Sequence, residues 1–157
     1  MRTVRQLLAS KAPDKSESAR GGAYGGESEI FAIGPDAAVI DAIRLMAEKR
    51  IGAVLVMEGP RLVGILSERD YARKVVLEGR SSKDTAVREI MTTDVVTVCP
   101  DDTADACMQI VTERRIRHLP VREGGQVVGV ISIGDLVKAV IEDQQLELDQ
   151  LQRYIAS

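Results

Sequence analysis

The order of apolar and polar positions is the same in two stretches of the chain. Residues 30–76 align with residues 95–141 without a gap. Identities at matched positions include Pro35 with Pro100, Asp36 with Asp101, Glu48 with Glu113, Ile51 with Ile116, Val56 with Val121, Gly64 with Gly129, Ser67 with Ser132 and Asp70 with Asp135. A register kept over this length indicates an internal duplication.

Each copy predicts a strand, a helix, two strands and a second helix. In the first copy a β-like run at 30–33 precedes Pro35 and Asp36, a pair that can open a helix. Apolar residues then recur at helical spacing, as Val39, Ala42, Ile43 and Met46. The remaining elements of this copy are apolar runs at 51–57 and 62–66, the turn at 58–60 and a helix at 68–78.

The second copy predicts the same elements at the matched positions. They are a strand at 95–98, a helix with the stripe Ala104, Cys107, Met108 and Val111, strands at 116–121 and 127–131, the turn at 123–125 and a helix at 133–142. A copy of about 50 to 60 residues is marginal alone. We therefore expect a mixed α/β (α+β) fold in which two β-α-β-β-α repeats pack together with pseudo-two-fold symmetry.

The segments before and after the two repeats do not share the duplicated pattern. We expect an N-terminal helix at 3–10 and a mobile segment at 11–28, which is rich in Ser, Gly, Ala and charge. The predicted division of the chain is 1–28, a first domain at 29–80, a linker with a short helical lead-in at 81–92, a second domain at 93–142 and an amphipathic helix at 143–157. Leu148, Leu151 and Ile155 lie at helical spacing in this last segment, which calls for a partner surface within the chain or on a second subunit.

The net charge and the amino-acid composition of the chain limit the kinds of partner that it is expected to bind. A formal net charge of -3 gives no cationic field, and aromatic residues are 3% of the chain, so nucleic acid is a poor partner. Cys99 and Cys107 suggest neither a metal cluster nor a disulfide framework. No signal-peptide core and no run of about 18 apolar residues occurs, so the sequence predicts no membrane association and a cytoplasmic protein.

The pattern Ser-x-x-Asp occurs where each repeat passes from its last strand to its last helix. Ser67 with Asp70 and Ser132 with Asp135 have the form of a capping box. A carboxylate can also accept both hydroxyls of a ribose, and a helix N-terminus can offer N–H groups to a phosphate. Capping and ligand binding are both open from the sequence, and they can coexist.

The repeats resemble the CBS domain family, whose paired form is called a Bateman module. The resemblance covers residues 30–141 and is carried by Gly64 to Asp70, by Gly129 to Asp135, by Met91-Thr92 and by the phrase from Arg115 to Val121. It implies a regulatory protein that binds an adenosine nucleotide in the clefts between its repeats. In proteins similar to this one the aspartate holds the ribose, and the strand edge of the other repeat completes the site.

Carried onto this chain, the resemblance implies two unequal clefts. One would join Ser67, Arg69, Asp70, Thr92, Val95, Arg117, His118 and Pro120, and the other Ser132, Gly134, Asp135, Val130, Ile30, Gly52, Ala53 and Val54. The first set is cationic and suits phosphates, whereas the second is small or apolar. We therefore expect AMP as the favoured ligand and NAD as an alternative in the other cleft.

The sequence gives no support for catalysis. His118 is the single histidine of the chain, so no cluster of histidines can hold a metal, and no convincing nucleophile lies near it in sequence. Arg73 and Lys74 are interpreted as a solvated helix face. We expect a homodimer that signals energy or redox state to an unidentified regulated protein. The alternative is a structural dimerisation or scaffold module with degenerate clefts.

Overall fold

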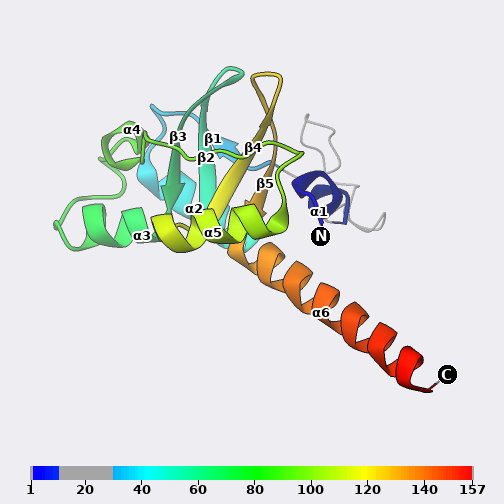
Figure 1. The fold of residues 1–157 in the computed structure, drawn as a ribbon. Helices are drawn as coiled ribbons and strands as arrows, with labels where there is room; N and C mark the ends of the chain where they lie inside the picture. Colours follow the sequence, from blue (N-terminus) through cyan, green and yellow to red (C-terminus); the bar gives the residue numbers. More distant parts are fainter. Residues whose placement is uncertain (1, 11–29, 157) are drawn as a thin grey trace. The chain divides into compact units, whose positions relative to one another are not determined.

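The computed structural model describes residues 2–10 and 30–156, which form two compact units (Figure 1). Residues 30–96 make up the first-repeat unit, and residues 2–10 with 97–156 make up the second-repeat unit. The segment predicted to be mobile, 11–28, lies outside the described residues. No helix within the described ranges is long and apolar enough to cross a bilayer.

The first-repeat unit is built on a three-stranded sheet. Its strands are β1 Ala32–Ile33, β2 Ala53–Glu58 and β3 Arg61–Ser67, in the order β1-β2-β3, with β1 parallel and β3 antiparallel to β2. Gly59 supplies the positive φ that the β2–β3 turn requires. The unit's helices are α2 Val39–Lys49, α3 Glu68–Tyr71, the π-helical segment η1 Ala72–Val76 and α4 Val87–Ile90.

The helical stripe predicted for α2 forms the core of this unit. Val39, Ala42 and Met46 are at most 2% exposed, and Ile43 packs against them. They share the core with residues from the sheet and the closing helices, namely Val54, Val56, Leu66, Val75, Val87 and Ile90. Core burial of this kind is the main favourable contribution to folding.

The second-repeat unit contains the matched hairpin and helices. Its elements are α5 Ala104–Arg114, β4 His118–Glu123, β5 Gln126–Ser132 and α6 Ile133–Ala156, together with α1 Val4–Ser10. The predicted N-terminal helix is thus confirmed. Its backbone is tied to the start of the second repeat, because Val4 N donates to Asp102 O at 2.8 Å and Ala104 N to Arg2 O at 2.9 Å.

Three predicted elements differ from the structure. The strand expected at 95–98 is a single parallel bridge between Val98 and Val121, so this sheet has two named strands. The helix expected at 68–78 changes after Tyr71 to η1, where Leu77 N bonds to Ala72 O five residues back. The helix expected to end at 142 continues without a break as α6, so the predicted division at 142/143 falls inside one helix.

A short segment after α4 runs beside β3. Ile65 and Thr92 exchange two backbone hydrogen bonds, of 3.0 and 2.9 Å. This approach requires a glycine at position 64, because a Cβ there would lie 2.7 Å from Met91 Sδ and 3.0 Å from Thr92 O. Gly64 therefore allows the segment carrying Thr92 to reach the end of β3.

Replacing Gly64 by alanine should lower the free energy of unfolding by about 1–3 kcal/mol, since the methyl group must displace Met91 or the Thr92 backbone. Urea denaturation measures the effect. Gly34→Ala is the matched control, because nothing lies within 4 Å of its Cβ position, and it should change stability by no more than about 0.5 kcal/mol. Equal stability of the two variants would contradict the close approach.

Candidate functional site

Two aspartates occupy equivalent places at the two strand-to-helix junctions. β3 ends at Ser67 and α3 begins at Glu68, with Asp70 in its first turn. β5 ends at Ser132 and α6 begins at Ile133, with Asp135 in its first turn. An extended backbone at Ser67, with φ -109° and ψ 163°, turns the chain from strand to helix at this point.

The predicted capping box is present at both junctions. Ser67 N donates to Asp70 Oδ2 at 3.0 Å, and Asp70 N donates to Ser67 Oγ at 3.1 Å. In the second repeat, Ser132 N donates to Asp135 Oδ2 at 2.8 Å and Asp135 N to Ser132 Oγ at 3.2 Å. The reciprocal bonds fix the carboxylate at the head of the helix and satisfy backbone donors that the helix leaves open.

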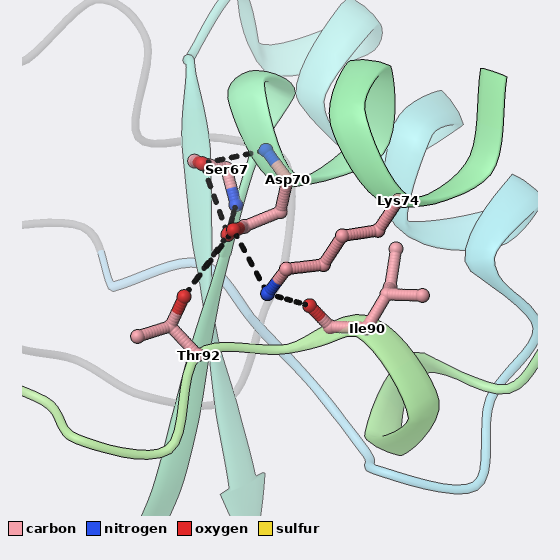
Figure 2. A network of polar contacts seen from close by, with 5 residues as sticks. All are labelled: Ser67, Asp70, Lys74, Ile90 and Thr92. Atoms are coloured by element: carbon pink, nitrogen blue, oxygen red, sulfur yellow. Dashed lines mark hydrogen bonds and ion pairs between the residues drawn. The ribbon is translucent and has the colours of Figure 1, made fainter. Parts of the chain in front are cut away.

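Asp70 also belongs to a wider polar network, which Figure 2 shows. Thr92 Oγ1 donates to Asp70 Oδ1 at 3.2 Å, from the segment that Gly64 admits beside β3. Ser67 Oγ lies 3.0 Å from Oδ2 of the same carboxylate. The structure therefore brings together three residues predicted for one site, Ser67, Asp70 and Thr92, and leaves the Asp70 side chain 14% exposed.

Lys74 is a member of this network that the sequence interpretation missed. Its Nζ lies 3.4 Å from Asp70 Oδ1 and donates to Ile90 O at 2.9 Å, so the ammonium joins the first turn of α3 to the end of α4 (Figure 2). The i, i+4 spacing of Asp70 and Lys74 was a usable signal for the ion pair. Nothing in the sequence indicated the hydrogen bond from Lys74 to the carbonyl oxygen of Ile90. The Lys74 side chain is 44% exposed, so it lies on a solvated face as expected, and its contacts with Asp70 and Ile90 are additional to that interpretation.

The second repeat cannot build the same network. The alignment places Ala139, which is 1% exposed, at the position of Lys74. It also places Gly134 at the position of Arg69. The surroundings of Asp135 within its own helix are therefore uncharged at the two positions where those of Asp70 are cationic.

Several of the backbone N–H groups that the sequence offered to a phosphate at these helix starts already have partners in the structure. Glu68 N donates to Gly52 O at 3.0 Å and Asp70 N to Ser67 Oγ. In the other repeat Ile133 N donates to Arg117 O at 2.8 Å.

The other predicted site residues are divided between the two units. Ile30, Gly52, Ala53, Val54, Arg69 and Val95 belong to the first-repeat unit, and Arg117, His118, Pro120, Val130 and Gly134 to the second-repeat unit. Val54 is 1% exposed in the core of its own unit, and Pro120 is also buried. The grouping of residues from both units into two clefts stays a prediction.

We next consider the two thiols and the acidic groups of the part of the chain that the structure describes. Within residues 2–10 and 30–156, no group of three or more His, Cys, Asp or Glu side chains is placed to hold a metal ion. Burial, together with the nearby charge of Asp102, raises the pKa of Cys107 to about 11, so its thiol stays protonated at neutral pH. Cys99 is exposed and free.

Comparison with known proteins gives a consistent result. The family model for the CBS domain matches residues 27–77 and 87–142. The CBS domain-containing protein CBSX3, mitochondrial, of Arabidopsis thaliana is 42% identical over 125 residues, which are 76% of this chain and 61% of that protein. This chain thus spans about three fifths of the length of that relative.

Solved structures extend the similarity to the whole architecture. A signal-transduction protein with CBS domains from Burkholderia ambifaria is 52% identical, with a TM-score of 0.78 over 91% of this chain and 96% of that one. A CBS domain pair in complex with 5′-methylthioadenosine and S-adenosyl-L-methionine has a TM-score of 0.72 at 19% identity, over 91% and 98% of the two chains. At 19% identity, the similarity to this second structure shows a shared fold alone.

Replacing Ser67 by alanine removes the side-chain half of the capping box and should lower the free energy of unfolding by about 0.5–2 kcal/mol. Ser132→Ala should have an effect of similar size, since the same bond is lost. Thermal or urea unfolding measures both. The exposed linker serine, Ser81→Ala, is the control and should leave stability within about 0.5 kcal/mol of the wild type. If the cap variants match it, the junctions do not depend on these bonds.

Proposed function

The chain belongs to the CBS domain family, and from that premise we propose that it is a regulatory module that senses an adenosine nucleotide. Asp70 and Asp135 receive the ribose hydroxyls in this proposal. Bound nucleotide shifts the module between conformations that differ in affinity for the ligand, and a regulated protein responds to the change. The module performs no catalysis itself.

The observation that carries the proposal is that the two carboxylate oxygens of Asp70 make different contacts. Oδ2 accepts the bonds of the capping box from Ser67. Oδ1 faces Thr92 Oγ1 at 3.2 Å and Lys74 Nζ at 3.4 Å, contacts that are long for their type, and Thr92 Oγ1 also lies 3.4 Å from Oδ2. A ribose hydroxyl can replace such a contact while the cap stays closed, so binding does not have to unfold the helix start.

Charge distinguishes the ligands proposed for the two aspartates. Arg69 and Lys74 lie within one turn of Asp70, whereas Gly134 and Ala139 hold the equivalent places around Asp135. Guanidinium and ammonium groups favour phosphate. We therefore assign AMP to the Asp70 site and a different adenosine compound, with NAD as the leading choice, to the Asp135 site. The residues that the family resemblance adds to each site from the other repeat are part of this proposal.

The adenosine class is supported by the CBS domain pair that was crystallised with 5′-methylthioadenosine and S-adenosyl-L-methionine. Both compounds carry an adenosine moiety, so this fold can accommodate one. The choice of AMP rests on the cationic side chains around Asp70.

We also propose a homodimer in the cytoplasm as the working form of the protein. The exposed apolar residues of α6, such as Leu148 at 52% and Leu151 at 57%, favour self-association. The same observation supports a second candidate function, a structural dimerisation module with degenerate ligand sites. That alternative requires self-association with no response to nucleotides.

A thermal-shift screen with AMP, ADP, ATP, NAD, NADH and S-adenosylmethionine tests the sensing function. A ligand at about 100 times its Kd should raise Tm by about 5–10 °C. Asp70→Asn should abolish most of the AMP shift and leave the NAD shift, and Asp135→Asn should do the reverse. The exposed Asp84→Asn is the matched control and should keep both shifts. A wild-type protein that responds to none of the six compounds would contradict nucleotide sensing.

A further inference from the structure

α6 has a row of exposed, mostly apolar residues along one face. The α6 seam consists of Val137, Ile141, Gln144, Leu148, Leu151 and Ile155, separated alternately by four and three residues. Its five apolar members are 42–80% exposed, and Gln144 near the centre is exposed as well. A spacing of this kind, with one polar residue in the series, is that of a coiled-coil interface.

The face of α6 opposite the seam packs against other elements of the second-repeat unit. Leu136 is fully buried and Ala139 is 1% exposed, because the first turns of α6 pack on α5 and β5. Arg2 adds ion pairs to Glu142 at 2.6 Å and to Asp143 at 3.1 Å, which tie the middle of the helix to the N-terminal segment. This packing therefore leaves the seam on the face of α6 that does not contact the core of the second-repeat unit.

The described part of the chain has no other helix long enough to cover the seam. From Val137 to Ile155 the seam runs about 27 Å at 1.5 Å per residue. The next longest described helices, α2 and α5, have 11 residues each. The sequence of residues 11–29 contains one large apolar residue, Tyr24, and cannot supply a matching stripe. A second α6 has the required length and pattern.

Charge excludes an anionic lipid surface as the occupant. α6 carries five acidic residues, Asp135, Glu142, Asp143, Glu147 and Asp149, and two basic residues, Lys138 and Arg153. Helices that lie on membranes have a polar face rich in Lys and Arg. An acidic polar face beside a coiled-coil seam fits a protein helix instead.

We propose that the α6 seam is the interface between two copies of this chain, paired helix to helix. This proposal rests on the homodimer proposed above and specifies its surface. Gln144 interrupts the apolar series near its centre, and a polar residue at one seam position is known to fix the register of paired helices. The seam contains neither Asp70 nor Asp135, so substitutions in it leave both proposed ribose-binding residues unchanged.

Sedimentation of the full-length chain tests the proposal with two matched variants. Leu148→Glu places a charge in the seam and should raise the dimer dissociation constant more than about tenfold. Leu146→Glu makes the same change two residues away, off the seam, at a side chain that is 54% exposed against 52% for Leu148. This control should sediment like the wild type.

The outcomes separate the two proposals. A wild-type chain that stays monomeric at all concentrations overturns both the homodimer and the seam. A dimer that Leu148→Glu leaves intact overturns the seam alone. Dissociation by Leu148→Glu but not by Leu146→Glu supports the seam.

Cross-linking provides a second measurement that needs no destabilising variant. In a Cys99→Ser background the remaining thiol, Cys107, is buried and does not compete. A bifunctional maleimide should join two chains through Gln144→Cys in much higher yield than through Leu146→Cys. Equal yields from the two positions would overturn the pairing of seams.

Discussion

The reciprocal bond between a serine at the end of a strand and an aspartate in the following helix is the interaction on which the rest of this structure depends. It closes the last turn of each repeat, between β3 and α3 and between β5 and α6, with bonds of 2.8 to 3.2 Å. The bond fixes the direction of each closing helix and the position of the carboxylate at once. A structural requirement and a candidate binding group are therefore the same side chain, and capping and ligand binding are compatible roles.

The two repeats use this common junction differently. In the first-repeat unit Gly64 lets the segment after α4 reach β3, so Thr92 and Lys74 both contact Asp70. Lys74 also holds Ile90 O, which links the carboxylate to the end of α4. A ligand that displaces Lys74 from Asp70 would loosen this link. In the second repeat the position of Lys74 is occupied by a buried alanine, so the second repeat has no equivalent of this link.

Much of the fold could be predicted because its determinants are local. The duplication, the two hairpins and both capping boxes follow from residue spacing, and the structure confirms them. The structure differs from the prediction where tertiary contacts determine the secondary structure. The second copy retains a single bridge at Val98 in place of a strand, and the helix after Tyr71 adopts π-type bonding that no residue pattern marked. α6 continues through residue 142 because neither glycine nor proline occurs in it after Gly134.

The candidate site was predictable to a similar extent. The motif located both aspartates, and the family resemblance added Thr92, which does contact Asp70. Lys74 was missed because its carbonyl partner, Ile90, lies 16 residues away in sequence, and only folding brings the two together. The seam of α6 was visible as Leu148, Leu151 and Ile155, but its full length emerged once α6 proved to be one helix.

Ribose binding by Asp70 can be seen directly in a crystal structure of the protein with AMP. We expect a ribose hydroxyl about 2.5–3.0 Å from Oδ1 of Asp70, with the bonds from Ser67 to Oδ2 retained. AMP bound elsewhere, with Asp70 still held by Thr92 and Lys74, would contradict this expectation.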